Sequence, residues 1–254
     1  YDLSQVLILS SVEDFRHIPE IVDKIQPSLD LTKGPLFRIV VFTNPAQQQR
    51  LFIVCHHLII DGVSWRILLE DIELCLTQSL QSTPDSVFAL GPKTTSFQQW
   101  CQYLEQWPDS AERAAEITYW QRRLQIQVPE YGLASDQCAY VSPEYVDTLH
   151  FVFDKTTTEK LLQQANQTYR THINELLLAA LLKGFSLWSG QHCLRVDLEG
   201  HGREVLDSDY DLSRTVGWFT TTFPLTLQAS SIEVSDLICT VKEQYREVPH
   251  KGIG

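Results

Sequence analysis

The chain has 254 residues, 43% of them hydrophobic, so it is long enough to bury a sizeable core in one large domain or in two lobes. Its formal net charge of −12 argues against nucleic acid as the main partner, because phosphate binding requires clustered Lys and Arg side chains. The most apolar segment, residues 175–188, is interrupted by Lys183 and Gly184, so we expect no membrane span and no membrane partner.

The numbers of cysteines and methionines indicate the redox compartment and whether the chain is part of a longer protein. The sequence contains six cysteines and no methionine. Because the cysteines show neither a CxxC pair nor a zinc-ligand spacing, we expect thiols in a reducing, cytoplasmic setting. Because the chain lacks methionine and shows no targeting signal, we interpret it as an internal piece of a longer cytoplasmic protein.

The first half of the chain alternates β-rich runs with segments of helical period, as in a mixed α/β fold. Strands are predicted at residues 6–10, 36–42 and 51–55. Residues 64–80 are predicted to form a helix, with Ser64 as its N-cap, because apolar residues recur there at helical spacing. The residues expected on its buried face are Ile67, Leu68, Ile72, Leu74, Leu76 and Leu80.

A second long helix and a lobe boundary are predicted next along the chain. The motif DSAE at residues 109–112 fits a capping box that starts a helix reaching Leu124. Residues 125–146 contain Pro and Gly and lack periodicity, which predicts the boundary between two lobes. We assign the lobes as residues 1–135 and 136–254.

The second lobe is predicted to open with a strand and two helices. Alternation predicts the strand at residues 148–153, and the motif TTTE at residues 156–159 is predicted to cap a helix that ends near Tyr169. The next helix is expected at residues 174–188. It is apolar nearly all round, which predicts burial on several sides.

Two histidines, a carboxylate and a glycine lie together in HHLIIDG, residues 56–62. His56 and His57 follow a predicted strand, and strand alternation directs their side chains to opposite faces. Gly62 allows a tight turn that brings the next helix beside the strand end. Either both are hydrogen-bonded structural histidines or one of them moves a proton, and adjacency alone leaves both readings open.

A second polar motif, EGHGRE, follows the half-buried strand predicted at residues 193–198. Glu199 lies at the strand end, and Gly200 and Gly202 flank His201, which lets a ligand approach the backbone closely. The alternative is a glycine-rich turn that carries solvated charges. No metal site is expected, because the histidines and the glutamate of the two motifs lack a zinc-ligand spacing such as HExxH.

Aromatic and threonine residues alternate over residues 214–227, which predicts a core strand. Gly217 permits close backbone contact in this stretch. Pro224 indicates an edge strand or a bulge, because proline cannot donate to a central ladder.

Together these stretches resemble the epimerization domains of nonribosomal peptide synthetases, in the condensation-domain superfamily. HHLIIDGVSWRILLEDIE (56–73) is similar to the HHxxxDG signature of that superfamily, with an epimerization-type continuation. EGHGRE (199–204) and RTVGWFTTTFP (214–224) resemble two further epimerization signatures, and VPHKGIG (248–254) resembles the start of another. The resemblance spans nearly the whole chain.

The resemblance implies a chloramphenicol acetyltransferase-like, two-lobed α/β sandwich, truncated here at both ends, with a substrate tunnel between the lobes. It implies an epimerase that converts the Cα of an aminoacyl or peptidyl thioester from L to D. The 4′-phosphopantetheine arm of a peptidyl carrier domain holds this thioester, so the carrier domain and neighbouring synthetase modules are the expected partners. No metal and no tightly bound organic cofactor is expected.

The same resemblance implies roles for individual residues. His57 and Glu199 are the expected acid–base pair, because inverting a planar enolate requires proton transfer on both of its faces. Arg203 is the expected cationic partner of Asp61, since a buried carboxylate requires one. The full set of supporting residues is His56, Asp61, Gly62, His201 and Arg203. The residues expected to line the tunnel are Trp218, Thr220 and Thr221.

Two other functions fit the same motifs. A condensation domain, which joins two thioester-bound substrates, shares the HHxxxDG signature, whereas EGHGRE and VGWFTTTFP favour the epimerase. A non-catalytic module that only docks a carrier domain is the second alternative. The intact acid–base candidates argue against decay of the parent protein to such a module.

Overall fold

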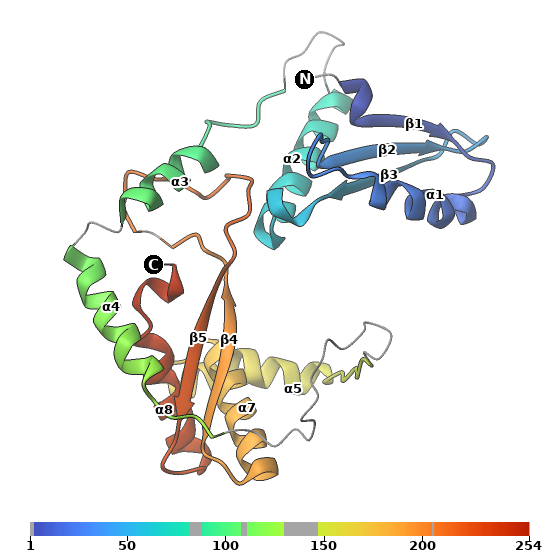
Figure 1. The fold of residues 1–254 in the computed structure, drawn as a ribbon. Coiled ribbons are helices and arrows are strands. Elements are labelled where there is room, and N and C mark those ends of the chain that lie inside the picture. Colours follow the sequence, from blue (N-terminus) through green and yellow to red (C-terminus); the bar gives the residue numbers. More distant parts are fainter. Residues whose placement is uncertain (1–2, 82–87, 108–110, 130–146, 205, 254) are drawn as a thin grey trace. The chain divides into compact units, whose positions relative to one another are not determined.

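The computed structural model describes residues 3–81, 88–107, 111–129, 147–204 and 206–253. The chain divides into two compact units (Figure 1). Unit 1 comprises Tyr1–Glu105 and Val205–Thr220, and unit 2 comprises Gln106–Glu204 and Thr221–Gly254. The segment after Glu204 therefore returns to the first unit before β5 begins.

Unit 1 is built on a three-stranded sheet in the order β1-β2-β3. β1 (Leu7–Ser11) runs parallel to β2 (Phe37–Thr43), which runs antiparallel to β3 (Gln49–Cys55). α1 (Ile18–Ile25) packs its apolar side chains around Val40 and Phe42, which are fully buried. The three predicted strands are confirmed. They form because their β-branched and aromatic residues fit a pleated, half-buried surface. Short 3₁₀ turns lie at Leu3–Gln5, Phe15–His17 and Gln26–Ser28.

α2 (Gly62–Gln81) follows the sheet and confirms the predicted helix. Its N-cap is Asp61, whose carboxylate accepts the Ser64 backbone N–H at 2.7 Å. The prediction of Ser64 as N-cap was wrong, because Ser64 lies inside the helix with none of its surface exposed. The predicted buried face is confirmed at Ile67, whereas Leu74, Leu76 and Leu80 are exposed. α3 (Phe97–Gln106) is the next helix along the chain.

Unit 2 pairs β4 (Cys193–Gly200) antiparallel to β5 (Thr221–Gln228). α7 (Ile173–Ser189) and α8 (Val234–Arg246) lie beside this pair (Figure 1) and bury a shared apolar core. α4 (Ala111–Leu124) adds partly buried aromatic side chains to that core. The fully buried core residues are Leu182, Leu225, Leu227, Leu237 and Val241.

An ion pair between a buried carboxylate and a partly exposed guanidinium ties α7 to α8. Glu175 is 1% exposed, and its carboxylate accepts from the Arg246 guanidinium at 2.7 Å and from the His172 backbone N–H at 2.7 Å. The hydrogen bond to Glu175 raises the pKa of Arg246. A short 3₁₀ turn, Pro249–Gly252, follows α8.

The helix predicted to end near Tyr169 is confirmed as one continuous helical run. It comprises α5 (Lys155–Glu159), a π-helical turn (Lys160–Ala165) and α6 (Asn166–Tyr169). Its N-cap is Asp154, whose carboxylate accepts the Thr157 backbone N–H at 2.7 Å, so the capping residue lies before the TTTE motif.

Three predicted features of this half of the chain are wrong. Residues 148–153 adopt no regular secondary structure, because no strand in the described ranges pairs with them. The strand predicted at 214–227 begins only at Thr221, and the residues before it are held by unit 1 instead. α7 is buried on one side rather than several, and its exposed residues include Leu177, Leu181, Leu187 and Trp188.

The compact units differ from the lobes expected at residues 1–135 and 136–254. α4 belongs to unit 2, where Arg123 donates to the Thr226 carbonyl at 2.8 Å. Residues 206–220 belong to unit 1, where the Asp211 carbonyl accepts the Thr95 N–H at 2.9 Å. The predicted boundary between residues 135 and 136 lies outside the described residues and stays a prediction. Asp109 of the DSAE motif lies outside the described residues.

Candidate functional site

The HHLIIDG motif forms the connection between β3 and α2. His57–Ile59 form a 3₁₀ turn, and His56 caps it, because its Nδ1 accepts the Leu58 backbone N–H at 3.2 Å. The His56 backbone N–H donates to the Leu36 carbonyl at 2.8 Å, so His56 is held at both its side chain and its backbone. The His57 side chain is exposed. A turn, rather than strand alternation, therefore gives the two histidines their different environments.

Asp61 is the buried anchor of this motif, with 3% of its surface exposed. Its Oδ1 accepts the Ser64 N–H at 2.7 Å, and its Oδ2 accepts the Phe219 N–H at 3.1 Å. The carboxylate thus lies at the N-terminus of α2, where the helix dipole favours a negative charge. Arg203, the cationic partner that the resemblance implies, is part of unit 2, and the pairing stays a prediction.

The segment around Gly217 is bonded to the first turns of α2. Ser64 Oγ donates to the Gly217 carbonyl at 2.8 Å and accepts the Gly217 N–H at 3.1 Å. Arg214 pairs with Glu70 and Asp71 of α2, which raises the pKa of its guanidinium. An added Cβ at Gly217 would lie 2.5 Å from the Phe97 ring, so the predicted close contact at this glycine is confirmed.

Trp218 lies between two anchored residues and projects to the exposed histidine. Its ring centroid is 6.1 Å from that of His57, and the two planes make an angle of 63°, an edge-to-face arrangement. Gly217 and Phe219 are buried, whereas 42% of Trp218 is exposed. The structure therefore brings together two of the predicted site residues, one from each motif.

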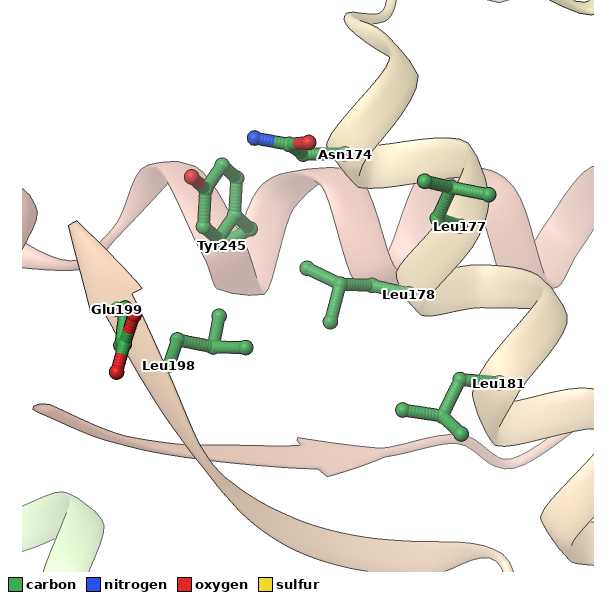
Figure 2. Close-up of a pocket in the computed structure, with 7 residues that line it drawn as sticks. All are labelled: Asn174, Leu177, Leu178, Leu181, Leu198, Glu199 and Tyr245. Carbon is green, nitrogen blue, oxygen red and sulfur yellow. The ribbon is translucent and has the colours of Figure 1, made fainter. Parts of the chain in front are cut away.

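Glu199 lies in β4, opposite Thr222 of β5, with its side chain exposed. It lines a pocket of about 240 Å³ that is bounded by β4, α7 and α8 (Figure 2). Figure 2 shows Leu178 of α7 and Leu198 of β4 pointing toward one another across this pocket. Typical small-molecule pockets are larger, about 300–1,000 Å³. The remaining lining residues are Asn174, Leu177, Leu181 and Tyr245.

The EGHGRE loop is closed by contacts within unit 2. His201 Nδ1 accepts the Arg203 N–H at 3.1 Å, and His201 Nε2 lies 3.2 Å from a carboxylate oxygen of Glu204. The other oxygen of Glu204 lies 3.3 Å from Lys251 Nζ. Glu204 therefore links the loop to the turn that follows α8, a role that only the structure reveals.

Gly200 serves packing in this loop rather than access for a ligand. An added Cβ there would lie 2.7 Å from Thr221 Oγ1 and 3.4 Å from the Lys251 carbonyl oxygen. The expectation that this glycine strips the backbone for ligand approach is therefore corrected, because the protein itself occupies the space. Gly62, in contrast, has nothing within 4 Å of an added Cβ, so its neighbourhood is open.

The predicted site residues fall into two groups. His56, His57, Asp61, Gly62, Trp218 and Thr220 belong to unit 1, and Glu199, His201, Arg203 and Thr221 belong to unit 2. Within the described part of the chain, no three His, Cys, Asp or Glu side chains are arranged to hold a metal ion. The described cysteines are thiols, and Cys138 lies outside the described residues. No helix in the described ranges is long and apolar enough to cross a bilayer.

Comparison with known proteins identifies the family. A family model described as the condensation domain matches residues 3–254. The chain belongs to the condensation-domain family. It is 38% identical over 255 residues to a linear gramicidin synthase and 38% identical over 233 residues to tyrocidine synthase 1, both from Brevibacillus parabrevis. These alignments cover 100% and 91% of this chain but 5% and 21% of the relatives, so the chain corresponds to a small part of each.

Solved structures from two branches of the family match this chain. The epimerization domain from the third module of tyrocidine synthetase B matches with a TM-score of 0.85 and 33% identity, over 98% of this chain and 57% of that chain. The first condensation domain of the calcium-dependent antibiotic synthetase matches with a TM-score of 0.68 and 16% identity, over 98% and 54%. The α/β class and the chloramphenicol acetyltransferase-like fold are confirmed.

Proposed function

We propose that this chain is part of an epimerization domain that converts the Cα of an aminoacyl or peptidyl thioester from L to D during nonribosomal peptide synthesis. The observation that carries the proposal is the higher similarity to an epimerization domain than to a condensation domain, in both TM-score and identity. The EGHGRE and VGWFTTTFP motifs support the same assignment, since both resemble epimerization signatures. Condensation remains the alternative, because the HHxxxDG motif is common to both activities.

The proposed chemistry is proton removal and return at Cα. Sulfur donates less electron density into a carbonyl than oxygen or nitrogen, so the Cα proton of a thioester is comparatively acidic. When a base removes this proton, the C–H electron pair is delocalised onto the thioester oxygen as an enolate. A second group then donates a proton to the opposite face, and the Cα configuration is inverted. Each such acid–base group typically contributes about 10²–10⁴-fold to the rate.

His57 and Glu199 are the proposed pair. Both side chains are exposed, so both are accessible to a substrate. His57 stands at the start of a 3₁₀ turn, beside Trp218, and Glu199 lines the pocket between β4 and the helices. A base and an acid that come from different parts of the chain can act on opposite faces of one planar enolate, which is the geometry that inversion requires.

The proposed partners are a carrier domain and the neighbouring synthetase modules. The carrier domain supplies the substrate on its phosphopantetheine arm, so the arm is part of the substrate rather than a resident cofactor. The reaction balances with proton transfer alone, and we propose neither a metal nor a tightly bound organic cofactor.

The test compares two products from the intact synthetase. The carrier domain is loaded with an L-aminoacyl thioester in D₂O, a second loaded carrier domain is supplied, and the products are analysed by chiral chromatography and mass spectrometry. We expect deuterium at Cα and the D enantiomer in wild type. Formation of the D enantiomer should be abolished in His57→Ala and retained in the matched control His17→Ala, an exposed histidine of unit 1. Amide formation with a retained Cα proton that is lost in His57→Ala and kept in His17→Ala would establish a condensation domain instead.

A further inference from the structure

The structure places an aromatic side chain against the proposed acid–base histidine. We infer that Trp218 is a positioning residue for His57: its indole ring limits the orientations of the imidazole. The inference rests on the proposed function of His57 and adds to it, because the resemblance implied only that Trp218 lines the tunnel. It connects the VGWF stretch to the HHxxxDG motif through contacts that lie entirely within unit 1.

His57 requires such a neighbour because of where it lies. Its side chain is exposed and extends from the first residue of a short 3₁₀ turn. An exposed side chain samples several rotamers, whereas a general base must lie within hydrogen-bond reach of one proton. The ring of Trp218, at a centroid distance of 6.1 Å and an interplanar angle of 63°, excludes part of that conformational freedom. Restricting the imidazole before the substrate arrives reduces the entropic cost of reaction.

Trp218 is held in place by the residues on either side of it. Gly217 bonds to Ser64 through both its N–H and its carbonyl, and the Phe219 N–H bonds to Asp61. The Phe219 ring also contacts Phe97 edge-to-face, at a centroid distance of 5.0 Å. Both neighbours of Trp218 are thus fixed to buried partners, and the backbone between them directs the indole outward, toward the imidazole.

Asp61, the buried carboxylate of the HHxxxDG motif, has two structural roles in this arrangement. Asp61 caps α2 through one oxygen and holds the segment next to Trp218 through the other. One buried side chain therefore determines the start of the helix after His57 and the place of the indole beside His57. A motif aspartate that takes no part in proton transfer can influence the histidine in this way.

The test uses two variants in the intact synthetase, Trp218→Ala and Trp218→Phe. Alanine removes the ring and phenylalanine retains an aromatic ring. We expect Trp218→Ala to slow single-turnover Cα deuterium exchange by about 10–100-fold, because small misplacements of a catalytic group have effects of that size. We expect Trp218→Phe to restore most of the rate. Trp188→Ala, which removes an indole that is 66% exposed on α7, is the matched control and is expected to leave the rate unchanged.

A second readout does not depend on activity. Diethyl pyrocarbonate modifies accessible imidazoles, and peptide mass spectrometry gives the rate at each histidine. We expect faster modification of His57 in Trp218→Ala than in wild type. His250 is the internal reference and is expected to react at an unchanged rate. Its ring centroid lies 5.2 Å from that of Trp107.

The outcomes separate this inference from the proposed function. If wild type exchanges no Cα proton, the proposed function fails, and the modification rates alone decide whether Trp218 shields His57. If wild type exchanges but Trp218→Ala matches it in both readouts, the inference is overturned and the proposed function stands. A parallel rise at His57 and His250 would indicate general loosening of the fold and would also overturn the inference.

Discussion

Replacing Asp61 with alanine should loosen the start of α2 and the segment around Phe219 together. The carboxylate accepts two backbone N–H groups, from Ser64 and Phe219, in a site where 3% of the residue is exposed. Loss of an N-cap costs about 0.5–2 kcal/mol. Each buried N–H group left without a partner costs about 1–3 kcal/mol. The cap bond is the one to the Ser64 N–H, so the cap and the Phe219 N–H together give an expected local destabilisation of about 1.5–5 kcal/mol, before any contribution from the predicted Arg203 pair.

Amide hydrogen exchange in the intact synthetase measures this local destabilisation. Peptide mass spectrometry locates it along the chain. A loss of about 1.5–5 kcal/mol corresponds to exchange that is about 12- to 4,000-fold faster, since a factor of ten equals about 1.4 kcal/mol. The faster exchange should appear at the amides of Ser64 and Phe219. Asp61→Asn should have a smaller effect, because its amide oxygen can still accept the Ser64 N–H.

Asp71→Ala is the matched control, since Asp71 lies on the same helix and pairs with Arg214 at the surface. Surface pairs contribute about 0–1 kcal/mol, so exchange should change by less than about fivefold. If Asp61→Ala exchanges no faster than Asp71→Ala at these amides, the two buried hydrogen bonds do not carry the stability that we assign to them.

Three further predictions follow from the packing. Gly217→Ala should cost about 1–3 kcal/mol, because the new methyl group would meet the Phe97 ring at 2.5 Å; unchanged protection of this segment would contradict the close contact. Gly62→Ala should leave the protection of α2 unchanged or raise it, by up to about 1 kcal/mol, because an added Cβ meets nothing within 4 Å; a clear loss of protection would refute this. Burial raises the pKa of the Cys193 thiol, so iodoacetamide near neutral pH should alkylate the exposed Cys239 first, and equal rates would speak against the burial.

Local periodicity was sufficient to predict most regular elements of this fold. The strands β1 to β4 and the helix α7 appear within about two residues of their predicted ends, because each buries a face whose pattern is visible in a short window. Residues 148–153 show the limit of this reasoning. They have a strand-like alternation, yet a strand forms only when a second strand supplies its hydrogen bonds.

In the candidate site, too, some features can be predicted from short motifs, whereas others depend on contacts between residues far apart in the sequence. The motif residues could be singled out in the sequence, and their resemblance to family signatures, rather than the residue types alone, predicted their chemistry. The role of Ser64 could not, because its partner, Gly217, lies 153 residues further along the chain. For the same reason the contact between Trp218 and His57 is a product of tertiary packing, although each residue was singled out in its own motif.

The central claim is that two residues act on opposite faces of the substrate Cα. The most direct measurement loads the carrier domain of the intact synthetase with either the L- or the D-aminoacyl thioester in D₂O and follows deuterium at Cα in single turnovers. We predict that Glu199→Gln and His57→Ala differ in which enantiomer still exchanges, while neither variant completes the inversion. Equal exchange from both enantiomers in either variant would contradict the two-base assignment and indicate a single base with a mobile enolate.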